Sequence, residues 1–254
     1  MQTHTRHTGE GLWRSGMRVA IVGATGGIGA ALCAKLAART DIDQIYAISR
    51  SGPSPIAADI TPITADLLDE ASLAKAAIEL KAGGPLDRVI VATGVLSDNT
   101  GKIGPEKSWR EQTLPALEYV FAVNTFGPAL VAKHFLPLLT RKRLSVFAVL
   151  SARVGSITDN RLGGWHAYRA SKAALNMLIK NYALELARRN DQAIAVSLHP
   201  GTVATQLSER FTRSANRTVF SPEQAAAYLL EVIENLTPAD SGKTIDWAGK
   251  EIPP

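Results

Sequence analysis

Cysteine is almost missing from this chain of 254 residues, which has a single thiol at Cys33. One cysteine cannot form an internal disulfide, so cysteine usage gives no sign of an oxidising compartment, and Cys33 is expected to be a small buried residue on a helix. Long apolar runs are missing as well, because no stretch reaches eighteen uncharged apolar residues. Histidine and cysteine occur nowhere at zinc-ligand spacing. These absences predict a soluble, cytoplasmic protein without a membrane span or a metal centre.

The first sixteen residues are polar and lack the apolar centre of a secretory signal. We therefore expect a flexible lead-in over residues 1–16 and one domain over residues 17–254, with Met1 and Met17 both open as the native start. The net charge is +5, but the basic residues are mostly scattered. No base-reading element or aromatic stacking platform accompanies them, so nucleic acid is not an expected partner, whereas an anionic cofactor is.

Short apolar runs alternate with longer helical segments along the whole chain. Strands that are apolar throughout are buried on both faces, and intervening helices make them parallel. The predicted fold class is α/β: a single doubly wound Rossmann-type domain, with about seven parallel strands and helices on both faces. Strands are expected at 19–22, 44–49, 60–65, 88–92, 145–150, 193–198 and 243–247, and helices at 27–38, 72–80, 114–139, 167–189 and after Ser221-Pro222-Glu223.

A glycine cluster lies between the first strand and the first helix, where the sequence reads Gly23-Ala24-Thr25-Gly26-Gly27-Ile28-Gly29. Glycines permit a tight turn and a close backbone approach, and a helix N-terminus presents free N–H groups to phosphate charge. In this strand–loop–helix context the cluster predicts a dinucleotide pyrophosphate site. The alternative is a tight turn that holds no ligand.

The second predicted strand ends in Ser49-Arg50, where readers of NAD usually place an acid. An arginine attracts the 2′-phosphate that a carboxylate would repel, so NADP is favoured over NAD. Asp66 follows the third strand and is expected either to bind the adenine amino group or to cap a helix.

Tyr168 and Lys172 lie four residues apart near the start of a predicted helix and so share one face. A free tyrosine is a poor proton relay at neutral pH, but a neighbouring ammonium favours the phenolate and lowers the tyrosine pKa. The pair predicts an acid–base centre for a carbonyl/alcohol reaction. By itself this spacing also occurs on ordinary surface helices.

These motifs together resemble the classical short-chain dehydrogenase/reductase family, from about Met17 onward. The C-factor-like branch is the narrower resemblance, carried by residues 121–128 (FAVNTFGP), 151–160 (SARVGSITDN) and 163–168 (GGWHAY). The resemblance implies a Rossmann fold, a nicotinamide cofactor, and a Tyr–Lys centre aided by a serine and an asparagine. It also implies a homodimer or homotetramer built on the two long helices.

Carried onto this chain, the resemblance makes Tyr168 the acid/base and Lys172 the group that lowers its pKa and binds the nicotinamide ribose. Asn124 matches the helix asparagine that holds a relay water; Gly127-Pro128 must disturb that helix and free a carbonyl nearby. Cofactor contacts are expected from Gly23, Thr25, Gly27, Ile28, Gly29, Ser49, Arg50, Asp66, Leu67, Ala92, Thr93, Gly94, Tyr168, Lys172, Pro200, Gly201, Val203 and Thr205.

Three departures from the family pattern stand out. Val22 replaces the usual threonine before the first glycine, and residues 91–94 lack the usual asparagines. Spacing to Gly155 puts Ala152 where the carbonyl-polarising serine belongs, with Ser151 one residue early. Neighbours in an extended segment point to opposite faces, so Ser151 serves only if the chain turns there. Ser156 is a second candidate.

The resulting prediction is an NADP-dependent oxidoreductase that acts on a small carbonyl or alcohol. The alternative is a dinucleotide-binding signalling or regulatory protein with little turnover, suggested by Ala152 and by the branch resembled. The polar segment 206–219 is expected to be a mobile loop over the substrate.

Overall fold

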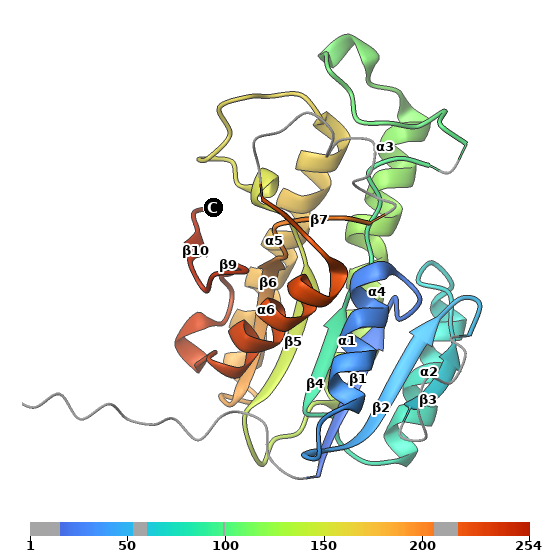
Figure 1. The fold of residues 1–254 in the computed structure, drawn as a ribbon, viewed down its shortest axis with the longest axis vertical. Coiled ribbons are helices and arrows are strands. Elements are labelled where there is room, and N and C mark those ends of the chain that lie inside the picture. The colour runs from blue at the N-terminus through green and yellow to red at the C-terminus, as the bar shows by residue number, and fades with distance from the viewer. Residues whose placement is uncertain (1–15, 53–59, 99, 206–217) are drawn as a thin grey trace, which may run out of the picture.

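Seven parallel strands and one short antiparallel strand form the central sheet of the protein. The structure is a computed structural model that describes residues 16–52, 60–98, 100–205 and 218–254. The strands lie in the order β10-β9-β6-β5-β4-β1-β2-β3 (Figure 1). Their bounds are β1 Met17–Val22, β2 Ile42–Ser49, β3 Ile60–Thr64, β4 Arg88–Val91, β5 Ser145–Leu150, β6 Ala193–His199, β9 Thr244–Asp246 and β10 Glu251–Ile252.

This sheet confirms the predicted doubly wound α/β fold with seven parallel strands. The sequence did not predict β10, which pairs antiparallel with β9. With two residues, this strand is too short to show a periodic pattern. A second two-stranded sheet, β7 (Thr202–Val203) with β8 (Val219–Phe220), was also not predicted. The lead-in up to residue 15 and most of the expected 206–219 loop lie outside the described residues.

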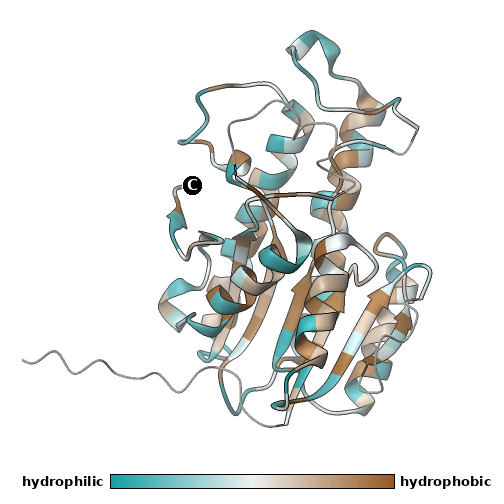
Figure 2. Ribbon diagram, viewed as in Figure 1, coloured by the Kyte–Doolittle hydropathy of each residue, from teal (hydrophilic) through white to brown (hydrophobic). Residues whose placement is uncertain are grey.

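Helices cover both faces of the sheet (Figure 1). α1 (Gly27–Ala37) and α6 (Pro222–Glu234) pack on one face. α2 (Glu70–Ala82), α4 (Gly127–Phe135) and α5 (His166–Ala187) pack on the other. The apolar strands in Figure 2 are therefore covered on both sides, as continuous apolar runs require.

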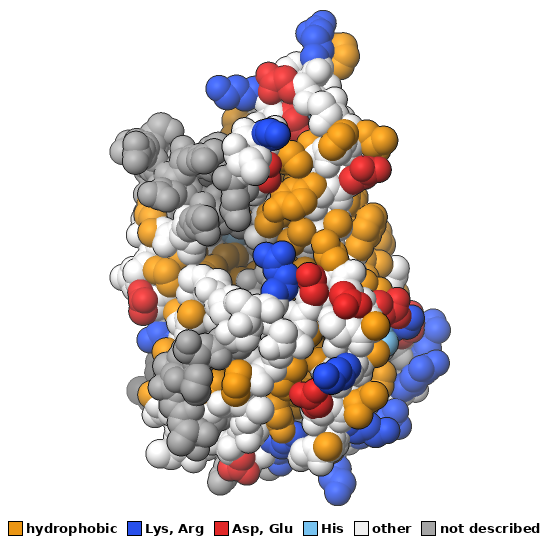
Figure 3. Space-filling view, turned by 90° about the vertical axis from the view of Figure 1, so that its right-hand side faces the viewer, with side chains coloured by type: hydrophobic (Ala, Val, Ile, Leu, Met, Phe, Trp, Pro, Cys, Tyr) orange, Lys and Arg blue, Asp and Glu red, His pale blue; other side chains and the backbone are white. Residues whose placement is uncertain are grey.

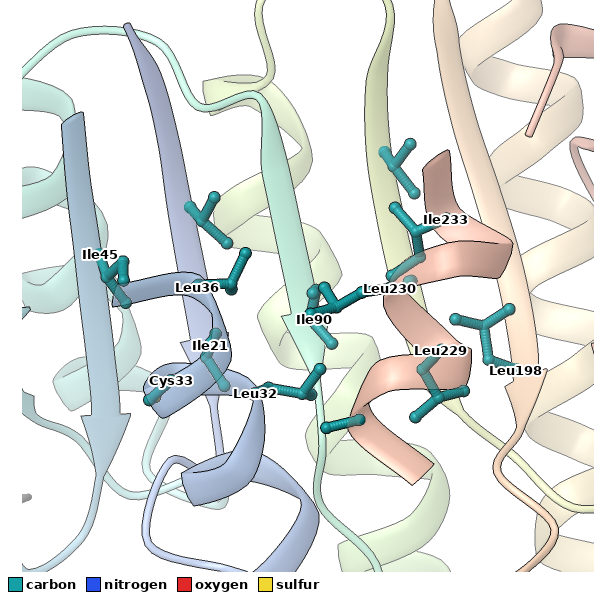
Figure 4. Packing of buried hydrophobic residues seen from close by; sticks show 14 of the residues in the cluster. Ile21, Leu32, Cys33, Leu36, Ile45, Ile90, Leu198, Leu229, Leu230 and Ile233 are labelled. Atoms are coloured by element: carbon teal, nitrogen blue, oxygen red, sulfur yellow. The ribbon is translucent and has the colours of Figure 1, made fainter. Parts of the chain in front are cut away.

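The core beneath α1 and α6 shows how these helices are held. Leu32 and Leu36 of α1 and Leu229 of α6 converge on the strand residues Ile21 and Ile90 (Figure 4). Cys33 belongs to the same cluster, and burial raises the pKa of its thiol to about 11. The thiol is thus a buried apolar residue on a helix, as expected.

The predicted long helix over residues 114–139 is interrupted in its middle. α3 (Leu114–Phe121) passes into a π-helical turn (Ala122–Phe126) before α4 begins, and a 3₁₀ turn (Leu136–Leu138) closes the run. Pro128 has no N–H for the carbonyl four residues before it, which explains a break at this point. The predicted disturbance near Gly127-Pro128 is confirmed as this π turn.

The stretch Leu114–Leu138 is long and apolar enough to cross a membrane when judged by length and composition alone. In the structure, however, the π turn divides it, and Val131 and Phe135 are fully buried against the sheet. The side of this stretch that faces the sheet therefore belongs to the core.

Candidate active site

A cavity of about 920 Å³ opens beyond the carboxyl ends of the parallel strands, where ligands of doubly wound sheets bind. Segments from widely separated regions of the chain meet there. Of the predicted site residues, those that line the cavity are Gly27, Ile28, Ala92, Thr93, Gly94, Ser151, Tyr168, Lys172, Pro200, Gly201, Val203 and Thr205.

The remaining predicted residues lie outside the cavity wall. Most of them follow the ends of β1, β2 and β3, so they extend the same edge of the sheet, where a second half of a long ligand would lie. Asn124 is different, because it is fully buried in the π turn. The predicted residues outside the wall are Gly23, Thr25, Gly29, Ser49, Arg50, Asp66, Leu67 and Asn124.

The glycine loop has the geometry of an anion site. Gly23 has φ +87°, and a Cβ on it would stand 2.8 Å from Thr93 Cγ2; a Cβ on Gly29 would overlap the Gly23 carbonyl. The N-cap residue Gly26 provides no side-chain cap, and the first turn of α1 carries no acidic residue. The first-turn N–H groups, which no helix can satisfy internally, are therefore available to phosphate oxygens.

Two buried hydroxyls near this loop fit a cofactor as well. Ser49 Oγ and Thr93 Oγ1 are buried without a hydrogen-bond partner among the described residues. Buried polar atoms are normally hydrogen-bonded, so these two hydroxyls fit a site that receives polar groups of a ligand. Arg50 is exposed immediately beyond Ser49.

Asp66 does not cap α2. The cap is Asp69, whose carboxylate accepts the N–H groups of Ala71 and Ser72. The Asp66 carboxylate accepts the Leu68 N–H at 2.9 Å, which orders the turn after β3. The helix-cap alternative for Asp66 is thereby removed, while the adenine contact stays a prediction.

Tyr168 and Lys172 occupy successive turns of α5 with both side chains at the cavity. The Lys172 ammonium lies 5.9 Å from the centre of the Tyr168 ring and donates a hydrogen bond to the Leu150 carbonyl at 2.8 Å. Burial penalises either charge: it raises the pKa of Tyr168 to about 12 and lowers the pKa of Lys172 to about 7. Near pH 7 the phenol is therefore protonated, while the lysine is divided between its ammonium and amine forms.

Asn124 joins this helix to the loop after β4. Its amide accepts the Val95 N–H at 2.8 Å and donates to the Val95 carbonyl at 2.9 Å and to Ser171 Oγ at 3.1 Å. Thr125 also donates to the Ser171 carbonyl. The π turn is thus hydrogen-bonded to α5 at Ser171, between Tyr168 and Lys172. The Asn124 carbonyl has no α-helical donor, because that donor would be Pro128, which has no N–H.

The position of the carbonyl-polarising serine is apolar. Ala152 packs against Tyr168 and Leu96, whereas Ser151 Oγ donates to Asn176 Oδ1 of α5 at 2.7 Å. Backbone angles at Ala152 are extended, φ −150° and ψ 145°, so the chain does not turn there. Ser151 would have to leave Asn176 to reach a substrate.

Ser156 is engaged elsewhere, because its hydroxyl donates to the Pro254 carbonyl at 3.3 Å and accepts the Asp159 N–H at 3.1 Å. It does not line the cavity. Neither predicted serine therefore presents a free hydroxyl beside Tyr168.

Several cavity residues were not predicted from the sequence. Leu96, Val154 and Trp165 form an apolar wall around Tyr168. His199 also lines the cavity, and burial together with the Arg153 charge lowers its pKa to about 4, so the imidazole is neutral. Position at the carboxyl end of a strand was the available signal for His199; the wall residues carry none.

Comparisons with known proteins agree with this geometry. The family model described as short chain dehydrogenase matches residues 17–216. The chain is 34% identical over 228 residues to 1-hydroxy-2-glutathionyl-2-methyl-3-butene dehydrogenase of Rhodococcus sp. (strain AD45), covering 89% of this chain and 94% of the relative. It is 33% identical over 170 residues to the C-signal protein of Myxococcus xanthus, covering 67% and 93%.

Solved structures with a similar fold include carbonyl reductases. An NADPH-bound carbonyl reductase from chicken fatty liver superposes with a TM-score of 0.79 at 24% identity, over 94% of this chain and 99% of that one. This likeness shows the fold, and the sequence matches show the family to which the chain belongs.

Proposed function

Because the chain belongs to the short-chain dehydrogenase family, whose members are NAD(P)-dependent oxidoreductases, we propose that it transfers a hydride between NADP and a carbonyl or alcohol carbon. The observation that carries the proposal is the buried Tyr168–Lys172 pair in a cavity that begins at an uncapped glycine loop. Bound NADP would supply or accept the hydride and, when oxidised, add a positive charge beside the pair.

In the reducing direction, Tyr168 donates its phenolic proton to the carbonyl oxygen as the carbon receives the hydride. The phenolate that forms is stabilised by protonated Lys172 on the next helical turn. Alcohol oxidation reverses the proton movement. Because Tyr168 and Lys172 are both buried, water screens the electrostatic interaction between them only weakly.

We assign the 2′-phosphate of NADP to Arg50, with Ser49 Oγ as a neighbouring donor. Arg50 is exposed at the end of β2, and the two described residues that follow it, Ser51 and Gly52, carry no carboxylate. A hydrogen bond to a charged group contributes about 1.5–3 kcal/mol, so Arg50→Ala is expected to weaken NADPH binding by about 10- to 100-fold. NADH affinity should stay unchanged in calorimetry, and the distant exposed Arg110→Ala should alter neither.

The apolar wall beside Tyr168 favours a substrate whose reacting carbon carries an apolar group. Leu96, Ala152 and Trp165 surround the phenol and offer no hydroxyl. The Rhodococcus relative is, by its name, a dehydrogenase of a glutathione-substituted butenol. A panel of aliphatic and aromatic aldehydes, ketones and alcohols is therefore the first one to screen.

The test of the proposed function is NADPH turnover across that panel by wild type and Tyr168→Phe. Loss of the acid–base group should lower the rate by about 10²- to 10⁴-fold, with NADPH binding retained. Equal rates for the two proteins on every substrate would refute the catalytic proposal.

A second candidate is a dinucleotide-binding signalling protein with little turnover. Ala152 at the serine position and the similarity to the Myxococcus C-signal protein favour it. It predicts NADP binding by calorimetry, turnover of no substrate in the panel, and a cellular effect that survives Tyr168→Phe.

We also propose that the protein forms a homodimer or homotetramer through α3–α5. Leu114, Phe126, Met177 and Leu184 are large apolar side chains of these helices and the π turn, each more than half exposed. Figure 3 shows hydrophobic side chains gathered on the upper half of the face where α3 lies. Such a gathering is typical of an interaction surface. A cytoplasmic location remains a prediction.

A further inference from the structure

A left-handed turn precedes the helix that carries Tyr168. Gly163, Gly164 and Trp165 have φ of +63°, +66° and +52°, and Trp165 is the one non-glycine residue with positive φ in the described part of the chain. A bulky side chain rarely adopts this conformation, and it persists only where the surroundings hold it. Such strain is concentrated at functional sites.

Glu106 holds the turn from a distant part of the sequence. Its carbonyl accepts the Trp165 N–H at 2.5 Å, and its carboxylate oxygens accept the Ala167 N–H at 3.3 and 3.4 Å. Glu106 is only 4% exposed, and no ion pair of the described residues includes it. A buried carboxylate that accepts hydrogen bonds from the first turn of one helix fixes the position of that helix start.

The Glu106 carboxylate caps the start of α5, because the N-cap residue of this helix has no capping side chain. Trp165 is the N-cap residue, it gives no side-chain cap, and the first turn of α5 contains no acid. A negative charge at a helix N-terminus is favourable. Since α5 begins at His166, Tyr168 lies in the first turn, where its position depends on how the helix starts.

Arg169 supports the same turn from the other side. Its guanidinium donates to the Gly163 and Gly164 carbonyls at 3.1 and 3.0 Å and to the Val154 carbonyl at 3.3 Å. Held between Glu106 and Arg169, the Trp165 ring lies edge-on to Tyr168, with ring centres 6.2 Å apart and planes at 74°. Trp165 also lines the cavity.

We propose that Glu106 is a positioning residue: it clamps the Gly163–Trp165 turn and the start of α5, and so sets the Trp165 ring and the Tyr168 hydroxyl at the substrate side of the cavity. This rests on the proposed function for its catalytic consequence. The clamp itself is a property of the fold. Glu106→Gln keeps the side-chain length and one acceptor oxygen, whereas Glu106→Ala removes both. Each variant keeps the main-chain carbonyl that accepts the Trp165 N–H, so the pair tests the carboxylate alone.

The experiment compares Glu106→Gln and Glu106→Ala with Glu111→Gln as a matched control. Glu111 lies in the same excursion of the chain, and its carboxylate accepts the Lys107 N–H at 2.8 Å without reaching α5. We expect kcat to fall about tenfold for Glu106→Ala and less for Glu106→Gln, with the NADPH dissociation constant within twofold of wild type. Glu111→Gln should match wild type in both.

A readout without turnover accompanies the kinetics. Quenching of Trp165 emission by bound NADPH, isolated by subtracting the Trp165→Phe protein, should fall in Glu106→Ala, and hydrogen exchange at residues 163–170 should accelerate. Unchanged Trp165 quenching and exchange in Glu106→Ala would overturn the positioning role of the Glu106 carboxylate. So would a fall in kcat no larger than the fall that Glu111→Gln produces.

The two proposals fail in distinguishable ways. If wild type binds NADPH but turns over no substrate, the proposed function fails, and the exchange and quenching measurements still test the clamp. If wild type turns over and Glu106→Ala equals it in kcat, only the clamp fails. Should Glu106→Ala not fold, Glu106→Gln carries the same comparison at a smaller amplitude.

Discussion

Tyr168 and Lys172 are the residues on which the proposed chemistry depends, and burial sets their protonation. Burial lowers the pKa of Lys172 to about 7 and raises that of Tyr168 to about 12. Without cofactor the phenol is thus neutral, and the lysine is present in both its protonated and neutral forms near pH 7. A positive nicotinamide would favour the phenolate and reduce the barrier to proton transfer.

The lysine pKa makes a stability prediction for the cofactor-free protein. Folding lowers the pKa of Lys172 from its ordinary value of 10.5 to about 7, so between these pH values the unfolded chain binds the extra proton. Unfolding free energy attributable to Lys172 should therefore rise as pH increases from 7 to 10. The measurement is urea unfolding of wild type minus Lys172→Met at each pH. A difference that falls over this range would contradict the burial of Lys172.

Ala152 supports a second prediction at a single position. Its methyl group packs on Tyr168 where a hydroxyl would polarise the substrate carbonyl. One such donor is worth about 10²–10³ in rate, so Ala152→Ser should raise kcat by about tenfold or more.

Ser151→Ala is the comparison for this change. Ser151 donates to Asn176, so its loss should change kcat by less than threefold. If Ser151→Ala abolished turnover while Ala152→Ser had no effect, Ser151 would be the donor after all, as the sequence left open.

The π turn between α3 and α4 is the element that links the sheet to α5, the helix that carries Tyr168. Asn124 and Thr125 bind α5 from it, and the turn exists because Pro128 breaks the α-helical ladder. Leu67, from the loop after β3, fills the space that Gly127 leaves. Sheet, π turn and α5 thereby form one rigid support for Tyr168.

Gly127→Ala should disturb this element. The added Cβ overlaps the Leu67 side chain, and overpacking of a tight core costs about 1–3 kcal/mol. Urea unfolding would measure the loss. Gly104→Ala is the matched control, because nothing lies within 4 Å of its Cβ, and a loss as large there would contradict the packing argument.

The whole molecule leaves an apolar surface uncovered along α3–α5. Met177 is 62% exposed on α5, on the side of the helix away from the sheet. If this surface pairs two subunits, Met177→Glu should lower the molar mass measured by light scattering towards that of one chain. Ile78→Glu, 70% exposed on α2, should leave the mass unchanged. A wild type that is already monomeric would rule the dimer out.

Local patterns were enough to predict much of this molecule. Apolar runs, the glycine cluster and the i, i+4 pair Tyr168/Lys172 are properties of neighbouring residues, and secondary structure alone converts them into positions. The seven parallel strands, the break at Gly127-Pro128 and the helix that opens at Ser221-Pro222-Glu223 followed in that way and are confirmed. The Tyr–Lys pair is placed together by one helix, whatever the rest of the fold does.

The contacts between distant segments had no such signal. Glu106 accepts a hydrogen bond from Ala167, 61 positions away in the chain. The Asn124 amide is hydrogen-bonded to Val95, 29 positions away. Whether Ser151 or Ala152 faces Tyr168 depended on the path of a few extended residues against α5. Residue spacing cannot predict these pairings, because they arise only when strands, loops and helices pack. That packing also sets the environment of the Tyr168 phenol.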